Sequence, residues 1–218
     1  MLADVDTWVL DLDDTLYPPS TGLSAQIGDG IRDYLIAFFG VDEAGARRKQ
    51  AELIAAHGTT LRGLMNLHGV DPADYLSFEH RLDFSVLRTD PVLVDAIAAL
   101  PGRKFVYTNA SGYHAEQALD RLGLTAEFDG VFDILAAGLV PKPHPGSYER
   151  FLERFSIDPT RAVMFEDLER NLTVPEQLGM ATILVGGEPA PGTAQYEVVA
   201  PRRWRVWDLA SFLFSLQD

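Results

Sequence analysis

Cysteine is absent from the 218 residues of the chain, and its absence excludes several kinds of site. No disulfide can form, no thiolate can bind zinc, and no cysteine nucleophile is available. Positive charge is also scarce, because 18 lysine and arginine residues stand against 32 acidic residues, for a formal net charge of -14. Such a chain repels nucleic-acid polymers and anionic membrane surfaces, so neither is expected as a partner.

Long apolar runs are missing as well. No stretch approaches the roughly 18 consecutive apolar residues that a membrane span needs. The N-terminal residues MLADVDTW carry acids where a secretory signal would carry lysine or arginine. We therefore expect a cytoplasmic protein without a membrane partner, and the sequence identifies no protein partner.

Short apolar runs alternate with amphipathic stretches along much of the chain. Five runs are typical of buried strands: Thr7–Asp11, Lys104–Asn109, Val131–Leu135, Ala162–Asp167 and Ala181–Val185. Helical patterns lie between several of them, at Asp90–Leu100, Gly112–Leu122, Pro145–Phe155 and Asn171–Leu178. The runs are nearly continuous in apolar character, which suits parallel strands covered on both faces. The alternation predicts an α/β fold with a doubly wound parallel sheet.

One interval breaks this alternation. About ninety residues without a convincing strand separate the first run from the second, far more than a strand-to-strand crossover requires. Helical spacing recurs there, at Ser24–Phe39, Glu43–His57, Thr60–His68 and Pro72–Leu82. We predict that residues 17–88 form an inserted helical domain, while residues 1–16 and 89–218 form the α/β core. The alternative is that these helices pack as extra layers on the core.

The first apolar run ends in a cluster of acids, in the stretch VLDLDDTLYPP that begins at Val9. Ligands of open parallel sheets collect beyond the carboxyl ends of the strands, where Asp11 lies. In an extended chain the side chains of Asp11 and Asp13 point the same way, and two close carboxylates resist ionisation unless a cation lies between them. Oxygen ligands of this kind suit Mg²⁺. Alternatively, Asp13, Asp14 and Thr15 merely turn the chain.

Three more groups of polar residues follow later strands or the loops beyond them. Thr108 and Asn109 end the second run, where a hydroxyl and backbone N–H groups can hold phosphate oxygens. Lys142 lies in the proline-rich loop VPKPHPG, and Glu166 with Asp167 ends the fourth run. Each has an ordinary explanation alone, as a helix cap, a solvated charge or an acid pair at a helix N-terminus. Together they indicate a site at one edge of the sheet.

Four groups of residues resemble the four motifs of the haloacid dehalogenase (HAD) superfamily, in order and in strand context. They are Asp11 to Thr15, Thr108, Lys142 and the Glu166–Asp167 pair. The resemblance spans essentially the whole chain. The stretches YTNASGYHAEQALDRLGL, KPHPGSYERFLERF and FEDLERNLTVPEQLGM are similar to the pyrimidine 5'-nucleotidase branch of that superfamily. The resemblance implies a Rossmann-like core and a helical cap between the first two motifs.

This resemblance implies that the protein is a magnesium-dependent phosphomonoester hydrolase. Asp11 would attack phosphorus and form an aspartyl phosphate, and Asp13 would serve as general acid and then general base. Mg²⁺ would be held by Asp11, by the backbone carbonyl of Asp13 and by Asp167, with Glu166 as a direct or water-bridged ligand. Lys142 would lie beside the nucleophile and the transferring group. Thr108 and the Asn109 amide would orient phosphate oxygens.

Two positions near the motifs depart from common patterns in the superfamily. Many relatives have glycine where this chain has Asp14, and Asn171 stands where some branches have a third acid. The histidines show no metal-binding spacing, and His57, His68, His80 and His114 are interpreted as surface or packing residues. The remaining histidine, His144, flanks Lys142 and is the histidine nearest the expected site.

The resemblance also suggests a small phosphate ester as substrate, with nucleoside 5'-monophosphates, preferably of pyrimidines, as the first choice. Discrimination would come from the cap, where the segment GTTLRGL offers Thr60 and Arg62 as substrate-binding residues. A phosphatase or phosphomutase acting on phosphoglycolate or sugar phosphates is the main alternative. A non-catalytic binding protein of this fold is another. A dehalogenase has no need of a general acid at Asp13.

Overall fold

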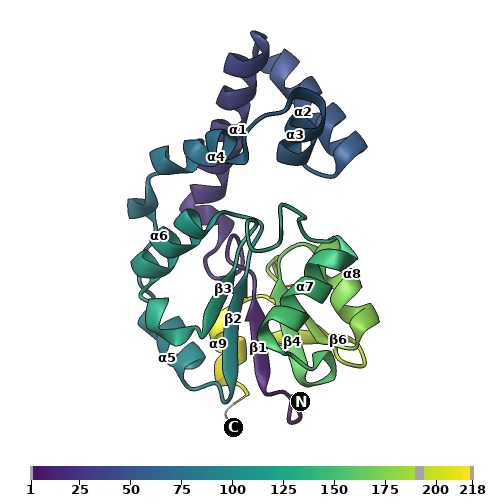
Figure 1. Cartoon of the computed structure of the whole chain (residues 1–218). Helices are drawn as coiled ribbons and strands as arrows, with labels where there is room; N and C mark the ends of the chain where they lie inside the picture. Colours follow the sequence, from purple (N-terminus) through teal and green to yellow (C-terminus); the bar gives the residue numbers. More distant parts are fainter. Residues whose placement is uncertain (1, 190–193, 217–218) are drawn as a thin grey trace. The chain divides into compact units, whose positions relative to one another are not determined.

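The computed structural model describes residues 2–189 and 194–216 of the chain. They form two compact units (Figure 1). The core unit comprises residues 1–18 and 87–218, and the helical unit comprises residues 19–86. None of the helices in the described ranges is both long and apolar enough to cross a bilayer.

A seven-stranded sheet in the order β3-β2-β1-β4-β5-β7-β6 forms the centre of the core unit. Its strands are β1 (Thr7–Leu10), β2 (Arg103–Tyr107), β3 (Gly130–Phe132), β4 (Ala162–Glu166), β5 (Ala181–Val185), β6 (Tyr196–Ala200) and β7 (Arg203–Val206). Every neighbouring pair is parallel except β6 with β7. The predicted α/β fold with a mostly parallel sheet is therefore confirmed.

The position of β1 in this sheet determines where a ligand site can form. In the register, Leu10 of β1 aligns with Val106 of β2 on one side and with Phe165 of β4 on the other. The chain builds β2 and β3 outward on one side of β1, then returns to build β4 and β5 on the opposite side. Such a reversal leaves a crevice at the carboxyl ends of the strands, which is where open α/β sheets bind ligands.

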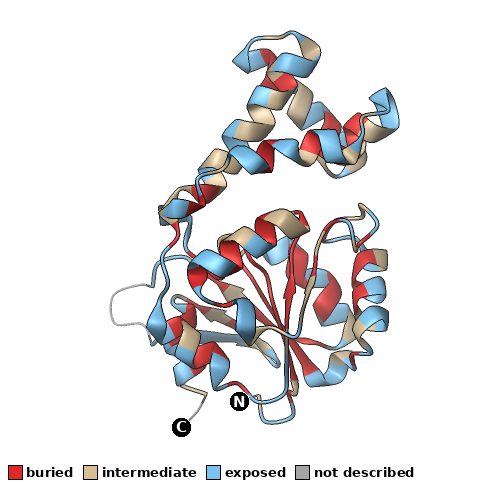
Figure 2. Cartoon of the chain, turned by 60° about the vertical axis from the view of Figure 1, so that its left-hand side comes forward, coloured by how far each residue is buried: buried red, intermediate tan, exposed pale blue. Residues whose placement is uncertain are grey.

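Helices cover both faces of this sheet. The core unit contains α5 (Pro91–Ala98), α6 (Gly112–Leu122), α7 (Pro145–Phe155), α8 (Glu169–Leu178) and α9 (Leu209–Phe214), with short 3-10 helices at Thr125–Glu127 and Pro159–Arg161. Val9 and Tyr107 face a cluster that includes Phe151 of α7 and Leu172 of α8. On the other face Phe165 packs against Phe212 of α9. Burial on both faces explains why the strands are nearly continuous in apolar character (Figure 2).

The helical unit is built from α1 (Leu23–Phe39), α2 (Glu43–His57), α3 (Thr60–His68) and α4 (Pro72–Leu76), with 3-10 helices at Pro19–Thr21, Ser77–Arg81 and Phe84–Val86. Asp42 and Thr59 cap α2 and α3 by accepting hydrogen bonds from backbone N–H groups in the first turn of each helix. Gly63 allows α2 and α3 to approach closely, because a Cβ at this position would lie 2.6 Å from a methyl carbon of Leu53.

Most expected elements differ from the observed ones by only one or two residues at their ends, but a few differ more. The expected strand over Val131–Leu135 is shorter and begins one residue earlier, at Gly130. The expected helix over Pro72–Leu82 divides into α4 and a 3-10 helix. Strands β6 and β7 were not expected, because both are short, and β6 is an edge strand whose valines Val198 and Val199 are exposed rather than buried.

Candidate functional site

Three strands deliver polar side chains to the same edge of the sheet. Asp11 follows β1 directly, and its backbone N–H donates to the carbonyl of Phe165 over 2.9 Å. Thr108 follows β2, and Glu166 is the last residue of β4. Since β1 lies between β2 and β4, these residues come together although more than 150 positions separate the first from the last. All three are buried.

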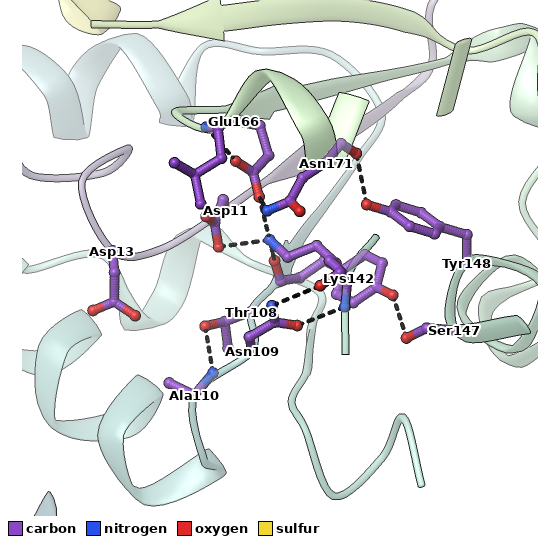
Figure 3. A network of polar contacts seen from close by, with 12 residues as sticks. Asp11, Asp13, Thr108, Asn109, Ala110, Lys142, Ser147, Tyr148, Glu166 and Asn171 are labelled. Carbon is purple, nitrogen blue, oxygen red and sulfur yellow. Dashed lines mark hydrogen bonds and ion pairs between the residues drawn. The ribbon is translucent and has the colours of Figure 1, made fainter. Parts of the chain in front are cut away.

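Lys142 is the cation at the centre of this group. Its Nζ lies 2.8 Å from Oδ1 of Asp11 and 2.8 Å from Oε1 of Glu166. The same ammonium donates to the backbone carbonyl of Tyr107 over 2.8 Å, so its three N–H groups have oxygen partners (Figure 3). Only 4% of Lys142 is exposed, which makes this a buried ion triad rather than a solvated surface charge.

Asn109 fixes the loop that carries Lys142. The backbone N–H of Lys142 donates to Oδ1 of Asn109 over 2.8 Å, and Nδ2 of Asn109 donates back to the carbonyl of Lys142 over 3.2 Å. This two-way pairing ties the loop to the end of β2. His144 is exposed, and its Nδ1 accepts from the N–H of Gly146 as the cap of α7.

The charges of the triad determine its protonation. Burial raises the pKa of Asp11 well above its ordinary value, although the charge of Lys142 opposes this shift. Burial would lower the pKa of Lys142, but the carboxylates of Asp11 and Glu166 outweigh it and raise that pKa. Burial likewise opposes ionisation of Glu166, but the Lys142 ammonium outweighs the effect of burial and lowers the pKa of Glu166. Lys142 is therefore protonated and Glu166 ionised at neutral pH.

A metal-binding arrangement lies on the same edge. Asp11, Glu166 and Asp167 each offer a carboxylate oxygen, and these oxygens lie within 4.8 Å of one another. Burial, followed by the charge of Glu166, raises the pKa of Asp167 to about 7. Crowded oxygen ligands whose ionisation is opposed in this way suit a hard cation such as Mg²⁺. The residues present therefore fit the metal that the sequence predicts.

Glu166 has less capacity for a metal than its neighbours. Its Oε1 accepts from Lys142 and, over 2.6 Å, from Nδ2 of Asn171. Its Oε2 accepts from the N–H of Leu168 over 2.8 Å. Asn171 is itself held by Tyr148, whose hydroxyl donates to the Asn171 carbonyl. An amide at this position gives Glu166 a hydrogen-bond donor where an acid would add a second negative charge.

The side chain of Asp13 departs from the expected common face with Asp11. The strand ends at Leu10, and the chain turns between Leu12 and Leu16, with Asp14 in the left-handed region at φ 60°. Asp is among the residues that tolerate this conformation. The period-two alternation of a strand is therefore lost. Figure 3 shows the Asp13 carboxylate apart from the triad of Asp11, Lys142 and Glu166.

Two residues that sequence analysis missed contact this carboxylate. Nε2 of His114 lies 2.7 Å from Oδ1 of Asp13, and the hydroxyl of Tyr17 donates to the same oxygen. Burial would raise the pKa of Asp13, but the hydrogen bond and charge of His114, together with Tyr17, lower it. His114 could have been identified from its position in the chain, because it lies in the first turn of α6, directly beyond the end of β2.

The remaining predicted residues lie in different surroundings. The hydroxyl of Thr108 is buried at the edge of the sheet and accepts from the N–H of Ala110 over 3.0 Å. Thr60 and Arg62 lie on α3 of the helical unit. Thr60 is buried beside the hydroxyl of Tyr75, whereas Arg62 is half-buried. The core unit thus brings together Asp11, Thr108, Lys142, Glu166 and Asp167 but contains neither Thr60 nor Arg62.

Comparison with known proteins identifies a family and curated relatives of the chain. The family described as haloacid dehalogenase-like hydrolase matches residues 5–179. Enolase-phosphatase E1 of Frankia alni is 41% identical over 68 residues, which cover 30% of this chain. The match spans only 28% of that relative's length.

Solved structures share the fold over almost the whole chain. A HAD phosphatase from Thermococcus onnurineus is 18% identical, with a TM-score of 0.61 and coverage of 98% of this chain and 96% of that one. The HAD-hydrolase YfnB from Bacillus subtilis, solved bound to magnesium, is 16% identical, with a TM-score of 0.61 and coverage of 98% and 99%. At these identities the likeness shows the fold alone.

Proposed function

Because the chain belongs to the haloacid dehalogenase-like hydrolases, we propose that it is a phosphomonoester hydrolase that works through an aspartyl phosphate on Asp11. The observation that carries the proposal is the buried contact between Asp11 and Lys142 at the carboxyl end of the central strand. A nucleophilic carboxylate needs a fixed positive charge beside it when an anionic phosphoryl group approaches, and Lys142 supplies that charge.

The reaction divides into two displacements at phosphorus. A carboxylate oxygen of Asp11 forms a bond to phosphorus while the bond to the ester oxygen breaks. Asp13, in the protonated fraction that its lowered pKa still leaves, gives a proton to the departing alcohol. Asp13 then takes a proton from water as that water attacks phosphorus. Inorganic phosphate leaves and Asp11 is restored. Thr108 and the backbone amide of Asn109 orient the phosphoryl oxygens, and Lys142 balances their charge.

Mg²⁺ is part of this proposal. The carboxylates of Asp11 and Asp167 and the backbone carbonyl of Asp13 would hold it. Glu166 would contribute through a water molecule, because both of its oxygens already accept hydrogen bonds from the protein. When bound, the ion supplies positive charge against the transferring phosphoryl group. Dehalogenation is less well supported, because a halide leaves as an anion and needs no proton donor such as Asp13.

A nucleoside 5'-monophosphate, preferably of a pyrimidine, is the proposed substrate. The core residues bind the phosphate that all such substrates share, so residues outside the core must select between substrates. We assign it to the helical unit acting as a cap, with Thr60 and Arg62 on α3 as substrate-binding residues. The support is the similarity of several stretches to pyrimidine 5'-nucleotidases.

The test of the proposed function is removal of the nucleophile. Asp11→Asn should abolish hydrolysis of an aryl phosphate in Mg²⁺, with a loss of several orders of magnitude, and EDTA should silence the native protein reversibly. Asp4→Asn removes an exposed acid near the same strand and serves as the matched control. Turnover that survives either Asp11→Asn or EDTA would disprove the proposed mechanism.

A further inference from the structure

His114 is a fully buried histidine that contacts a carboxylate at the candidate site. Its side chain is 0% exposed, whereas the Asp13 side chain is 25% exposed. Nε2 lies 2.7 Å from Oδ1 of Asp13, across 101 positions of sequence. A histidine that served packing alone would not need to be directed at the polar edge of the sheet. This contact therefore calls for a role in the chemistry of Asp13.

Helix α6 fixes the imidazole. Ser111 caps the helix, and its hydroxyl accepts from the backbone N–H of His114 over 3.2 Å. Ala115 and Ala118 on the same helix are fully buried, so α6 packs closely along this side. A capped helix and close packing restrict how a buried ring can turn. The position of Nε2 is thus set by the fold rather than by Asp13.

Tyr17 approaches the same carboxylate oxygen from the turn that follows β1. Its buried hydroxyl donates to Oδ1 of Asp13, so both hydrogen bonds converge on one oxygen. A carboxylate oxygen that accepts two hydrogen bonds has both lone pairs engaged. When Asp13 carries a proton, that proton belongs on Oδ2, which receives neither of these bonds.

We propose that His114 is a positioning residue that, together with Tyr17, anchors Oδ1 of Asp13 so that Oδ2 alone handles the transferred proton. The inference rests on the proposed function, in which Asp13 protonates the departing alcohol and then deprotonates water. The anchor stops the carboxyl group from rotating about its terminal bond, so the reactive oxygen is presented in one direction. His114 thus acts through Asp13 and does not itself touch the reacting atoms.

The test compares two esters of similar shape that differ in their need for a proton donor. Phenyl phosphate has a poor leaving group, whereas 4-nitrophenyl phosphate has a good one that departs with little protonation. His114→Leu and Tyr17→Phe should each lower kcat/KM for phenyl phosphate at least about 10-fold more than for the nitrophenyl ester, within the range of general-acid effects. His114→Gln keeps an N–H near the position of Nε2. It should therefore restore much of the native ratio of kcat/KM between the two esters.

Thr182→Ala is the matched control, because Thr182 is fully buried near the start of β5, away from the strand ends that carry the site. It should lower the melting temperature without changing the ratio of the two esters. If His114→Leu does not fold, Tyr17→Phe and His114→Gln carry the comparison. Equal losses on both esters in the folded variants would overturn the inference.

Asp13→Asn distinguishes failure of the positioning role from failure of the proposed function. If that variant loses phenyl phosphate turnover while the His114 and Tyr17 variants keep the native ratio, only the positioning role is wrong. If Asp13→Asn retains full turnover, or the native protein hydrolyses neither ester, the proposed function fails and the inference fails with it.

Discussion

The ammonium of Lys142 lies 2.8 Å from Asp11 and, at the same distance, contacts Glu166, so one buried cation serves two buried carboxylates. Burial raises the pKa of Asp11 well above its ordinary value, so before any metal binds the charge of Lys142 is balanced mainly by Glu166. Each carboxylate depends on Lys142, because moving an unpaired charge from water into a protein interior is costly. Stability and chemistry at this site thus rest on the same residue.

Lys142→Met should destabilise the metal-free protein by about 3–5 kcal/mol, because it leaves two carboxylates buried without their partner. Urea unfolding in EDTA measures the change. Adding Glu166→Gln should restore part of the stability but none of the activity. Lys49→Met, which removes an exposed ion pair with Glu52, should cost less than about 1 kcal/mol. A Lys142→Met protein as stable as the native one would contradict the triad.

Asp13→Asn should separate catalysis from metal binding. If the metal contacts only the backbone carbonyl of residue 13, the substitution leaves that ligand in place. We expect turnover to fall by roughly 10²- to 10⁴-fold, the range for loss of a general acid or base, while Mg²⁺ affinity stays close to native. Isothermal titration with Mg²⁺ measures the second quantity. Loss of affinity together with activity would make the Asp13 side chain a ligand.

Asp167→Asn should stabilise the metal-free protein at alkaline pH. Burial and the charge of Glu166 raise the pKa of Asp167 to about 7 in the folded state, above the 3.8 of an unperturbed carboxyl. The folded state thus holds this proton more tightly than the unfolded chain. The stabilisation is fully present below the unfolded value and is lost as the pH rises through about 7.

Thermal unfolding in EDTA tests the sign of this effect. The melting temperature of Asp167→Asn should exceed that of the native protein at about pH 8, and the advantage should shrink as the pH is lowered to about 5, where native Asp167 is protonated. Asp158→Asn, at an exposed position where the pKa is lowered instead of raised, is the control and should show no such gain. An advantage that grows toward low pH would refute the assignment.

Substrate preference tests the proposed cap. Uridine and cytidine 5'-monophosphates should have higher kcat/KM than purine monophosphates, phosphoglycolate or sugar phosphates. Arg62→Ala should reduce that preference while leaving 4-nitrophenyl phosphate hydrolysis unchanged, because an aryl ester offers no base to the helical unit. A preference for purines or sugar phosphates would reject the nucleotide assignment and leave the phosphatase proposal intact. Isomerised sugar phosphate among the products would indicate a phosphomutase.

The sheet was predictable because burial on both faces leaves a direct trace in the sequence. The strand at Ala181–Val185 was predicted at its observed bounds, and its burial explains why. Strand β6 was missed although it contains valines, because it is a short edge strand in which Val198 is 62% exposed and the apolar residues do not mark a buried face.

The site was predictable where it depends on strand ends and unpredictable where it depends on packing. Asp11 and Glu166 could be placed together, since neighbouring parallel strands end at one edge. The contact of Asp13 with His114 could not be predicted, because it depends on the turn at Asp14 and on the position of α6. Likewise, no local pattern reveals that the loop carrying Lys142 pairs with Asn109.

The pairing of β1 with β2 and β4 affects how the chain acquires activity during synthesis. Thr7 must find Arg103 on one side and Ala162 on the other, contacts that close very long loops and form slowly. The helices of residues 19–86 depend on nearer contacts and can form while the rest of the chain is still emerging from the ribosome. A nascent chain stalled before β4 would carry its nucleophile on a strand paired on one side only and without Glu166, so the chain becomes competent late in translation.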